Sequence, residues 1–488
     1  MNPRARFYDI HPRVVLAHAT TRITVRPCFS HVAFDPEHPY RAVVYPAEHY
    51  LQPDGEAQPA RITWRQGALQ IAHTFGAEQE YILEVLDETR SKPEVALRVL
   101  LYAVEPDLLQ CLPLKGDVHM HSHHSDGRES PAFVAASCRR IGLDFMALTD
   151  HRQYAPSVEA QEAFAGVDLD LLICRGEEVH PPDNPVHMVN FGGSSSINEA
   201  MRADGEAYLA AVREQEARLA GLPDEGVRRQ VASCCWVFDR IRQGGGLGIF
   251  CHPYWHVRHG YTPSAAVTAA LFARQPFDAY ELIGGYFRHE ADSNTLQVAR
   301  YHEERARGRL LPIVGVSDAH GCHNADLFGW YYTLVFAREH TQDGICAAIR
   351  ALRSVAVEAR PGEAPRVYGP LRLVQYALFL LGELFPLHDE LCVEEGRLML
   401  AHAAGDPEAR AQLAVLRGRC GRLWGRLLGG VPEAEEPPGE RERAGGGWVG
   451  RGARPGLLGP LSRHLAPAHL NSVTLQTRQA PPACRRTR

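Results

Sequence analysis

Asp117-Val118-His119-Met120-His121 is the stretch of this sequence that decides the fold, and Ser125-Asp126-Gly127 follows it closely. Along an extended strand, alternate side chains point to the same face, so His119 and His121 can hold one cation without bending the backbone. Asp126 can reach towards them from the following loop. This arrangement indicates a metal-dependent hydrolase.

Later apolar runs end in the same kinds of residue. They are residues 145–149 before Asp150-His151, 171–174 before Gly176-Glu177-Glu178, 248–251 before His252-Pro253, and 311–316 before Ser317-Asp318-Ala319-His320. Apolar strands separated by helical stretches are typical of parallel β/α units, in which the chemistry lies where the strands end. We therefore expect an α/β fold with a barrel-like arrangement.

The composition is that of an ordinary globular protein. A chain of 488 residues has room for several domains, of which a barrel alone takes about 200 to 250 residues. Hydrophobic residues make up 45% of the chain and the net charge is -6, which argues against disordered, fibrous and membrane proteins. The mildly acidic balance does not attract a nucleic-acid polymer, so small substrates are favoured.

The ends of the chain and its cysteines bear on its location. Residues 1–7 lack the apolar segment of a secretory signal, and no run reaches the roughly 18 apolar residues of a membrane-spanning helix. The 12 cysteines are scattered, without a dense disulfide pattern. We expect a cytoplasmic protein with no membrane partner, whose thiols are mostly buried and reduced.

Four regions are expected along the chain. Residues 1–112 carry short apolar runs typical of a small β-sandwich, for which a structural or homo-oligomerisation role is favoured over substrate recognition. Residues 113–360 hold the ligand motifs, with a helical insertion at about 195–246 that either caps the site or is an added structural hairpin. Residues 361–428 predict a helical extension, and the Gly-, Pro- and Arg-rich residues 429–488 predict a disordered tail.

The ordered motifs His-x-His with Ser-Asp-Gly, Thr-Asp-His, Gly-x-Glu, His-Pro and Ser-Asp-x-His resemble those of the PHP (polymerase and histidinol phosphatase) superfamily over about residues 115–360. The resemblance implies a distorted (β/α)7 TIM-like barrel that holds two or three divalent metal ions at its mouth. A β-rich N-terminal region joined directly to Gly-Asp-x-His-x-His also resembles the carbaryl-hydrolase-like branch of that superfamily.

The resemblance carries metal-binding roles to individual residues. They are His119, His121, Asp126, His151, Glu178, His187, His252, Asp318 and His320. It implies one metal ion among His119, His121, Glu178 and Asp318, a second shared by Glu178 with His187 and His252, and a third among Asp126, His151 and His320.

Some neighbouring residues compete for these roles. The Gly-x-Glu spacing selects Glu178 over Glu177, which becomes an outer or solvent-facing carboxylate, although a slip of one residue would reverse the two. His180 follows Glu178 too closely to be the next ligand and could touch the substrate instead. Asp117 and Asp150 are expected to orient ligand histidines by hydrogen bonds.

The donor set predicts the chemistry. A shell of histidines and carboxylates without an obvious thiolate suits Zn, Mn or Fe, and the family implies that a metal-bridging hydroxide attacks the substrate. The expected catalytic residues are Glu178, Asp318 and His320, the last assisting the leaving group. The expected substrate-binding residues are Trp255, His256 and Arg258, with core packing an equal alternative for Trp255.

The favoured function is a phosphoesterase that acts on a small phosphate ester or nucleotide. Carbamate or carboxylic ester hydrolysis is the alternative, and a noncatalytic metal-binding module is a third hypothesis. A proofreading role is weaker, because no polymerase motif accompanies the ligand motifs. A phosphate requires a cationic side chain and an aryl carbamate an apolar pocket, and Arg258, Arg288 and Trp255 leave both open.

Overall fold

The computed structural model describes residues 3–49, 58–89, 93–222, 224–257, 260–323 and 327–429. The chain divides into a compact unit, Met1–Pro432, and a second unit, Glu433–Arg488. The expected disordered tail therefore lies, apart from Gly429, outside the described residues. Within the described ranges, no helix combines the length and the apolar character needed to cross a bilayer.

The N-terminal residues form an eight-stranded sheet with the order β1-β3-β6-β5-β4-β7-β8-β2. Its strands are β1 (Tyr8–His11), β2 (Val14–Leu16), β3 (Thr20–Pro27), β4 (Tyr40–Pro46), β5 (Gln58–Arg65), β6 (Ala68–Thr74), β7 (Gln79–Asp87) and β8 (Glu94–Val104), with single turns of 3-10 helix at Pro3–Phe7, Ser30–Val32 and Ala47–His49. Neighbouring strands are antiparallel except β2 and β8. Alternate residues such as Leu97, Val99 and Leu101 point into one core, as a period of two requires. The division into a separate β-sandwich domain stays a prediction.

The ligand motifs lie on two further sheets. The six-stranded sheet has the order β11 (Leu172–Cys174), β10 (Phe145–Ala147), β9 (Leu112–Asp117), β19 (Tyr331–Ala337), β20 (Ser354–Glu358) and β21 (Arg366–Tyr368). The five-stranded sheet has the order β12 (Gly176–Val179), β13 (Met188–Phe191), β14 (Leu247–Phe250), β17 (Ala279–Gly284) and β18 (Ile313–Val316). The strands thus form two sheets, and the distorted barrel that the resemblance implies stays a prediction.

The two sheets meet along both sides. Only Arg175 separates β11 from β12. On the other side the Thr333 hydroxyl of β19 donates to the Gly315 carbonyl of β18 at 2.8 Å, and Ser354 of β20 donates to the Ile313 carbonyl at 2.7 Å. Apolar side chains from both sheets fill one core, including Leu114, Phe145, Val189, Phe191, Ile249, Val314 and Val335.

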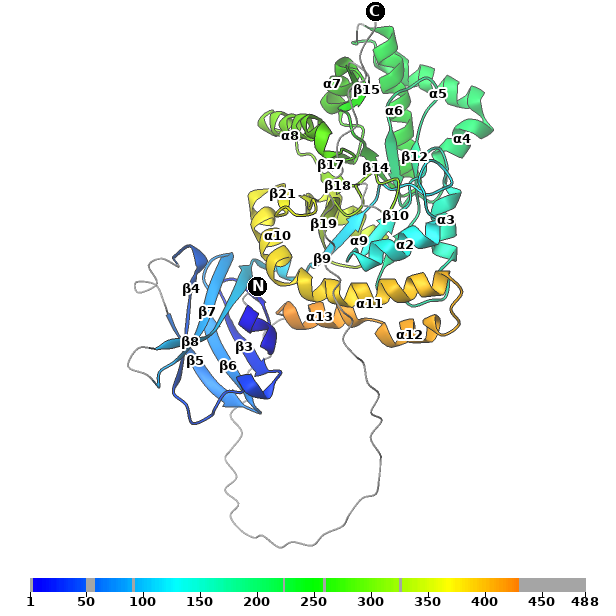
Figure 1. The fold of residues 1–488 in the computed structure, drawn as a ribbon. Helices are drawn as coiled ribbons and strands as arrows, with labels where there is room; N and C mark the ends of the chain where they lie inside the picture. The colour runs from blue at the N-terminus through cyan, green and yellow to red at the C-terminus, as the bar shows by residue number, and fades with distance from the viewer. Residues whose placement is uncertain are drawn as a thin grey trace, which may run out of the picture. The chain divides into compact units, whose positions relative to one another are not determined.

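Helices cover the outer faces of these sheets (Figure 1). They are α2 (Pro131–Arg140), α3 (Ala155–Glu162), α6 (Glu225–Gln243), α7 (Ala265–Arg274), α8 (Ala291–Ala306) and α9 (Gln342–Arg350). The helices α4 (Ile197–Ala203) and α5 (Gly205–Arg218) contact α6, and the short α1 (Pro106–Leu109) contacts β2 and β8 of the N-terminal sheet. A short hairpin, β15 (Trp255–Val257) and β16 (Gly260–Thr262), follows β14, and a 3-10 turn spans Arg288–Glu290.

Helices α4, α5 and α6 lie where the sequence predicted a helical insertion, and α6 packs its apolar face against the sheet. That this segment is an insertion stays a prediction. Val231, Val237, Phe238 and Ile241 are fully buried in the largest apolar cluster of the described residues. A Cβ on Gly248 of β14 would lie only 2.6 Å from the Phe238 ring, so the helix packs directly on the strand. α6 is therefore an outer-layer helix of the sheet, and not a detached cap.

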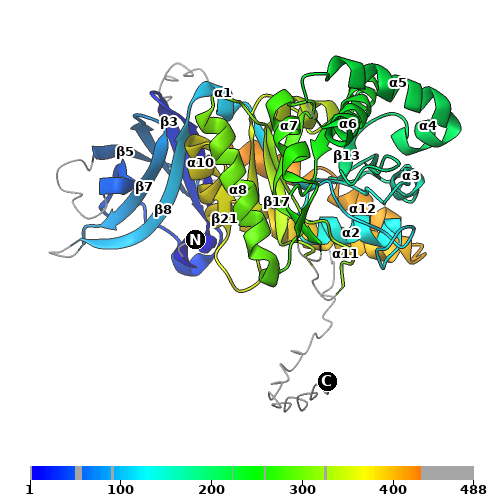
Figure 2. The ribbon, with the colours of Figure 1, turned by 90° about the horizontal axis from the view of Figure 1, so that it is seen from above.

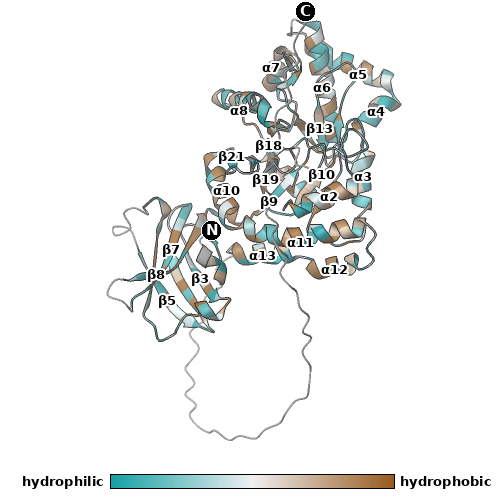
Figure 3. Cartoon of the chain, in the orientation of Figure 1, coloured by the Kyte–Doolittle hydropathy of each residue, from teal (hydrophilic) through white to brown (hydrophobic). Residues whose placement is uncertain are grey.

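The C-terminal extension has more helices than the two apolar segments that stand out in the sequence. It contains α10 (Leu371–Glu383), α11 (Phe385–Ala403), α12 (Ala409–Leu416) and α13 (Arg419–Leu427). α11 lies beside α2 in both views (Figures 1 and 2) and also contacts α12 and α13. α10 and α11 carry both hydrophobic and hydrophilic residues (Figure 3), as helices with one packed face do.

Candidate metal centre

His119 and His121 lie just beyond the end of β9. The strand ends at Asp117, but the chain continues, and Met120 forms an isolated parallel bridge with Ala319. Both imidazoles are buried, and their ring centroids lie 5.4 Å apart. The structure therefore brings the two side chains to one place, as alternation along an extended segment predicts.

Glu178 of β12 is the centre of the cluster. Its side chain has no exposed surface, and imidazoles surround its carboxylate. Oε2 lies 3.6 Å from His119, 3.7 Å from His121, 2.5 Å from His151 and 3.3 Å from His180, and Oε1 lies 2.8 Å from His187 and 3.5 Å from His252. Burial alone would raise the pKa of Glu178, but the charges of His187 and His119 bring it well below its ordinary value.

Asp318 follows β18 and faces the first two histidines. Its Oδ1 lies 2.8 Å from Nε2 of His121 and 3.3 Å from Nε2 of His119. Burial alone would raise the pKa of Asp318, but His119 and His121 outweigh it and the pKa falls. Asp318 therefore carries a negative charge where the two imidazoles converge.

Asp126 lies at the outer side of the same cluster. One carboxylate oxygen lies 3.3 Å from His151 and the other 3.3 Å from His320. Ligand atoms of Asp126, His151, His320 and His121 all lie within 4.8 Å of one another. The structure thus gathers every residue that the sequence predicted as a ligand around Glu178, with Asp126 and His320 at the solvent side.

These donors fit a divalent cation. Several buried atoms of the cluster have no hydrogen-bond partner among the described residues: His119 Nε2, His121 Nδ1, His187 Nδ1 and both carboxylate oxygens of Glu178. Unpaired polar atoms are costly inside a protein, and a cation coordinated between them would satisfy them. Imidazoles with carboxylates suit Zn, Mn or Fe.

Glu281 is a part of the centre that the motifs did not reveal. It lies on β17 with no exposed surface, and its Oε2 is 3.2 Å from Nδ1 of His119. A carboxylate on one ring nitrogen fixes the other nitrogen in the direction of the metal. Cys251 also lies in this group, and burial raises the pKa of its thiol.

His180 is closer to the centre than the sequence predicted. Its ring centroid lies 3.9 Å from that of His187, and its Nε2 is 3.0 Å from Nδ1 of His151. Both His180 and His187 therefore reach Glu178. Their spacing in the sequence could not separate them, because β12 and β13 are antiparallel neighbours that bring the two residues together.

The carboxylates beside the predicted ligands hold the backbone. Glu177 is buried and accepts hydrogen bonds from Asn190, Ser196 and Asn198 at 3.2, 2.7 and 2.8 Å, so it is an outer carboxylate and does not face solvent. Asp117 accepts from the backbone N–H of His119, and burial raises its pKa to about 7. Asp150 accepts from the hydroxyls of Ser122 and Ser125, and in this way positions the loop that carries Asp126.

The structure describes two of the three predicted substrate-binding residues, Trp255 and His256. Trp255 is 41% exposed, and its ring centroid lies 5.8 Å from His187 and 6.1 Å from His252. His256 is exposed and faces Tyr261, while Arg258 lies outside the described residues. Arg288 is paired with Glu363 and stacks on Trp330 at 5.3 Å. Trp255 is thus a surface side chain beside the centre.

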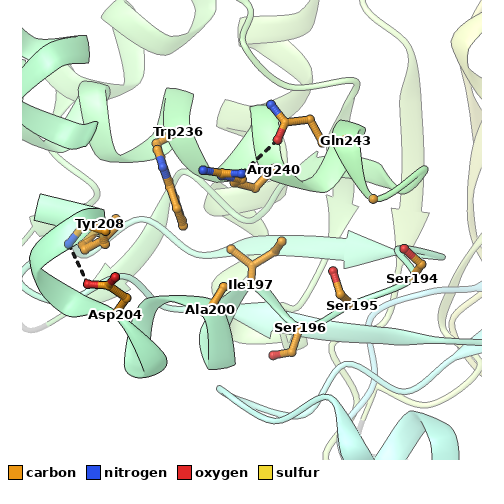
Figure 4. A pocket seen from close by; sticks show the side chains of 12 residues that line it. Ser194, Ser195, Ser196, Ile197, Ala200, Asp204, Tyr208, Trp236, Arg240 and Gln243 are labelled. Carbon is orange, nitrogen blue, oxygen red and sulfur yellow. Dashed lines mark hydrogen bonds between the residues drawn. The ribbon is translucent and has the colours of Figure 1, made fainter. Parts of the chain in front are cut away.

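A separate cavity of about 440 Å³ lies among α4, α5, α6 and the Ser194–Ser196 loop (Figure 4). Tyr208, Trp236 and Arg240 line it, and none of the predicted ligands is among its lining residues in the described part of the chain. Ser196 connects it to Glu177 through a hydrogen bond. The cavity is therefore a neighbour of the outer carboxylate, and not the mouth of the metal cluster.

Comparison with known proteins gives partial similarities. No protein-family model matches the chain. A segment of 86 residues is 41% identical to the DNA polymerase/3'-5' exonuclease PolX of Bacillus subtilis, which is 17% of this chain and 15% of that protein. The chain thus matches less than a sixth of the length of this relative.

Two of the solved structures that match part of this chain are described as phosphoesterases. A two-domain Bacteroides vulgatus protein containing a PHP-like metal-dependent phosphoesterase is 21% identical, with a TM-score of 0.36, over 51% of this chain and 65% of that chain. A metal-dependent phosphoesterase of Bifidobacterium adolescentis is also 21% identical, with a TM-score of 0.29, over 42% and 87%. The chain is similar, over part of its length, to proteins of this description.

Proposed function

We propose that this chain is a metal-dependent hydrolase, and that it is a phosphoesterase acting on a small phosphate ester or nucleotide. The observation that carries the proposal is the carboxylate of Glu178, which is fully buried among imidazoles whose nitrogen atoms lie as close as 2.5 and 2.8 Å to its two oxygens. The short PolX match supports phosphoester chemistry, since an exonuclease cleaves phosphodiesters. A cytoplasmic location remains the prediction made from the sequence.

We assign the donors to cations as the resemblance implies. His119, His121, Glu178 and Asp318 would hold one ion, Glu178 with His187 and His252 a second, and Asp126, His151 and His320 a third. Bound divalent cations would acidify a water molecule and stabilise charge on the attacked group. The proximity of His121 to the Asp126 group supports a continuous centre.

We propose that His320 assists the leaving group through the ion that it would hold. Its Nδ1 lies 2.8 Å from the carbonyl oxygen of Asp318, so Nδ1 donates and Nε2, which lies 3.3 Å from Asp126, is the atom that would bind that ion. The ring is partly exposed, so the oxygen of a departing alcohol could reach an ion held there. Asp318 and Glu178 keep the imidazoles in place and balance the charge of the cations.

We also propose that the six- and five-stranded sheets are the two parts of a distorted barrel. The shared core, the single residue between β11 and β12, and the bridges His151–Glu178 and Met120–Ala319 support it. Ligands at adjacent strand ends then converge at one mouth, as in β/α barrels.

Ester hydrolysis of an aryl carbamate is the second candidate, and Trp255 favours it. The indole is exposed next to His187 and His252, and Val257 and Tyr261 of the same β15–β16 hairpin are also exposed. Exposed apolar side chains beside the centre suit an aromatic leaving group. Arg288, engaged by Glu363, is a poor candidate for a free phosphate anchor.

The test is hydrolysis of p-nitrophenyl phosphate, bis-p-nitrophenyl phosphate and 1-naphthyl N-methylcarbamate by protein loaded with Mn or Zn. We expect the protein to hydrolyse the phosphate esters. In Glu178→Gln, turnover should fall at least about 100-fold, and the amount of bound metal should fall with it. His302→Ala, an exposed histidine on α8, is the matched control and should change neither. Turnover of the carbamate alone would replace the phosphoesterase by the second candidate, and stoichiometric metal without any turnover would favour a binding module.

A further inference from the structure

A second cluster of reactive side chains lies far along the chain from the metal-ligand motifs, at the contact between α11 and α13. His388 and Cys392 are one turn apart on α11, and Cys420 is the second residue of α13. Their ligand-type atoms all lie within 4.8 Å of one another, and all three residues are buried. The two sulfur atoms therefore lie close together, although the helices that carry them are joined by a long connection.

Arg139 gives this cluster a buried positive charge. It lies on α2 without exposed surface, and its Nε donates to Glu395 at 2.6 Å. Its Nη1 donates to Asp144 at 3.1 Å, and its Nη2 to the Cys420 sulfur at 2.9 Å. A guanidinium so close to sulfur favours the thiolate, and the first turn of α13 adds the positive end of a helix.

His388 is held as an imidazolium. Its Nε2 lies 2.7 Å from Asp144 and its Nδ1 3.0 Å from Asp389, so each ring nitrogen faces a carboxylate. Burial alone would lower the pKa of His388, but Asp144 raises it to about 10. The hydrogen bond with Cys392, helped by His388 and Arg139, lowers the pKa of Cys420 to about 5, whereas burial raises that of Cys392.

The geometry does not favour a metal ion at this place. The Cys392 sulfur lies 3.5 Å from both nitrogens of His388. Both nitrogens are already bound to carboxylates, and the Cys420 sulfur is in contact with a guanidinium. The positive charges of the His388 imidazolium and the Arg139 guanidinium therefore lie where a bound metal ion would have to be.

We propose that Cys392 and Cys420 form a redox-active dithiol, which hydrogen peroxide converts to a disulfide. The Cys420 thiolate attacks one peroxide oxygen, the O–O bond breaks, and hydroxide leaves, so that Cys420 becomes a sulfenic acid. The Cys392 thiol then attacks the Cys420 sulfur, the S–O bond breaks, and water leaves with the thiol proton. Two electrons pass from the sulfurs to the peroxide, and no other oxidant is required.

Oxidation would tie α13 to α11 and, through α13, to the N-terminal sheet. The Leu427 carbonyl accepts from the backbone N–H of Arg13 at 2.8 Å, and Gly429 N–H donates to the Val14 carbonyl at 2.8 Å. A disulfide closing the long segment between the two cysteines restricts the unfolded chain. The oxidised protein should therefore unfold at a temperature higher by about a few degrees.

The experiment uses the full chain, treated with stoichiometric hydrogen peroxide at pH 7, alkylated and digested without reductant. We expect mass spectrometry to find the linked Cys392–Cys420 peptide, and dithiothreitol to remove both the link and the rise in melting temperature. The peptide measurement requires no variant, so it stands even if a substitution in this buried cluster impairs folding. Unlinked, freely alkylated Cys392 and Cys420 after peroxide treatment would overturn the proposal.

Matched variants separate the pair from other thiols. Cys420→Ser and Cys392→Ser should each abolish the temperature shift, and Cys346→Ser should retain it, because burial raises the pKa of Cys346 to about 12. Metal analysis provides an independent check. If Cys420→Ser binds one zinc ion fewer than the unchanged protein, the cluster is a metal site and the dithiol assignment is wrong.

Discussion

At the scale of single residues, His119 shows how the centre is built. Its Nδ1 faces Glu281 at 3.2 Å, while its Nε2 faces Asp318 at 3.3 Å and Glu178 at 3.6 Å. The carboxylate on Nδ1 fixes the ring and makes Nε2 the better donor. Glu281 therefore acts on a metal ion through His119, as a positioning residue.

We expect Glu281→Gln to weaken metal binding by about 10- to 100-fold, because the amide is uncharged and no longer raises the basicity of His119. Equilibrium competition with a chromophoric chelator measures the affinity, and circular dichroism confirms the fold. Glu303→Gln, on the exposed face of α8, should leave the affinity unchanged. Equal affinities for the Glu281 variant and the unchanged protein would remove Glu281 from the centre.

The local sequence predicts the residues that gather here but not all of their neighbours. Because His119, His121 and Asp318 stand at the ends of apolar runs, the sequence was enough to predict that their side chains lie in one cluster. Glu281 stands inside an apolar run, 279–284, without a motif, and only the register of β17 against β18 places it near His119. The local periodicity of a sequence does not specify how distant strands pair.

At the scale of elements, β17 and β18 come into very close contact at Gly284. Its φ is 144°, and a Cβ built there would lie 1.8 Å from the Val316 carbonyl oxygen. A register shift in β17 precedes it, between Glu281 and Ile283. Only glycine allows the strands to come this close, and the contact directly precedes Ser317 and Asp318.

Gly284→Ala should lower the free energy of unfolding by more than about 2 kcal/mol, because the methyl group must displace backbone. Gly308→Ala is the matched control, since Gly308 also has a positive φ but has open space around it, and it should cost only about 1 kcal/mol. Urea titration followed by fluorescence measures both. Equal losses would mean that backbone conformation, and not the close contact, fixes this glycine.

Elements were predicted best where one strong pattern defines them. The strands before His252 and Asp318 and the apolar helices of the extension are such cases. Short α12 and α13 lie in a segment rich in Arg and Gly, and tertiary contacts hold them, such as Asp170 with the backbone of Gly418 and Cys420. The open edges of the two sheets also depend on packing that no single segment specifies.

At the scale of the whole molecule, a buried ion pair joins the N-terminal sheet to the C-terminal extension. Arg13 donates to Glu383 of α10 at 2.8 Å, and their side chains are only 4% and 7% exposed. The Nε of Arg13 also donates to the Leu100 carbonyl at 2.8 Å. Removing one partner takes away a close opposite charge from the buried group that remains.

Arg13→Met and Glu383→Leu should each cost about 3–5 kcal/mol of unfolding free energy, whereas the double variant should recover most of that loss. A double-mutant cycle from urea unfolding measures the coupling. Single losses below about 1 kcal/mol, the range of exposed pairs, would show that water reaches the pair.

The isolated bridge between Val14 and Leu428 has a consequence for synthesis on the ribosome. Strand β2 emerges early, but the segment that completes it emerges only after almost all of the described chain, on the order of a minute later at typical elongation rates. During that interval nascent β2 must persist without its final partner. Translation of the C-terminal helices therefore sets the moment at which the beginning of the protein reaches its native contacts.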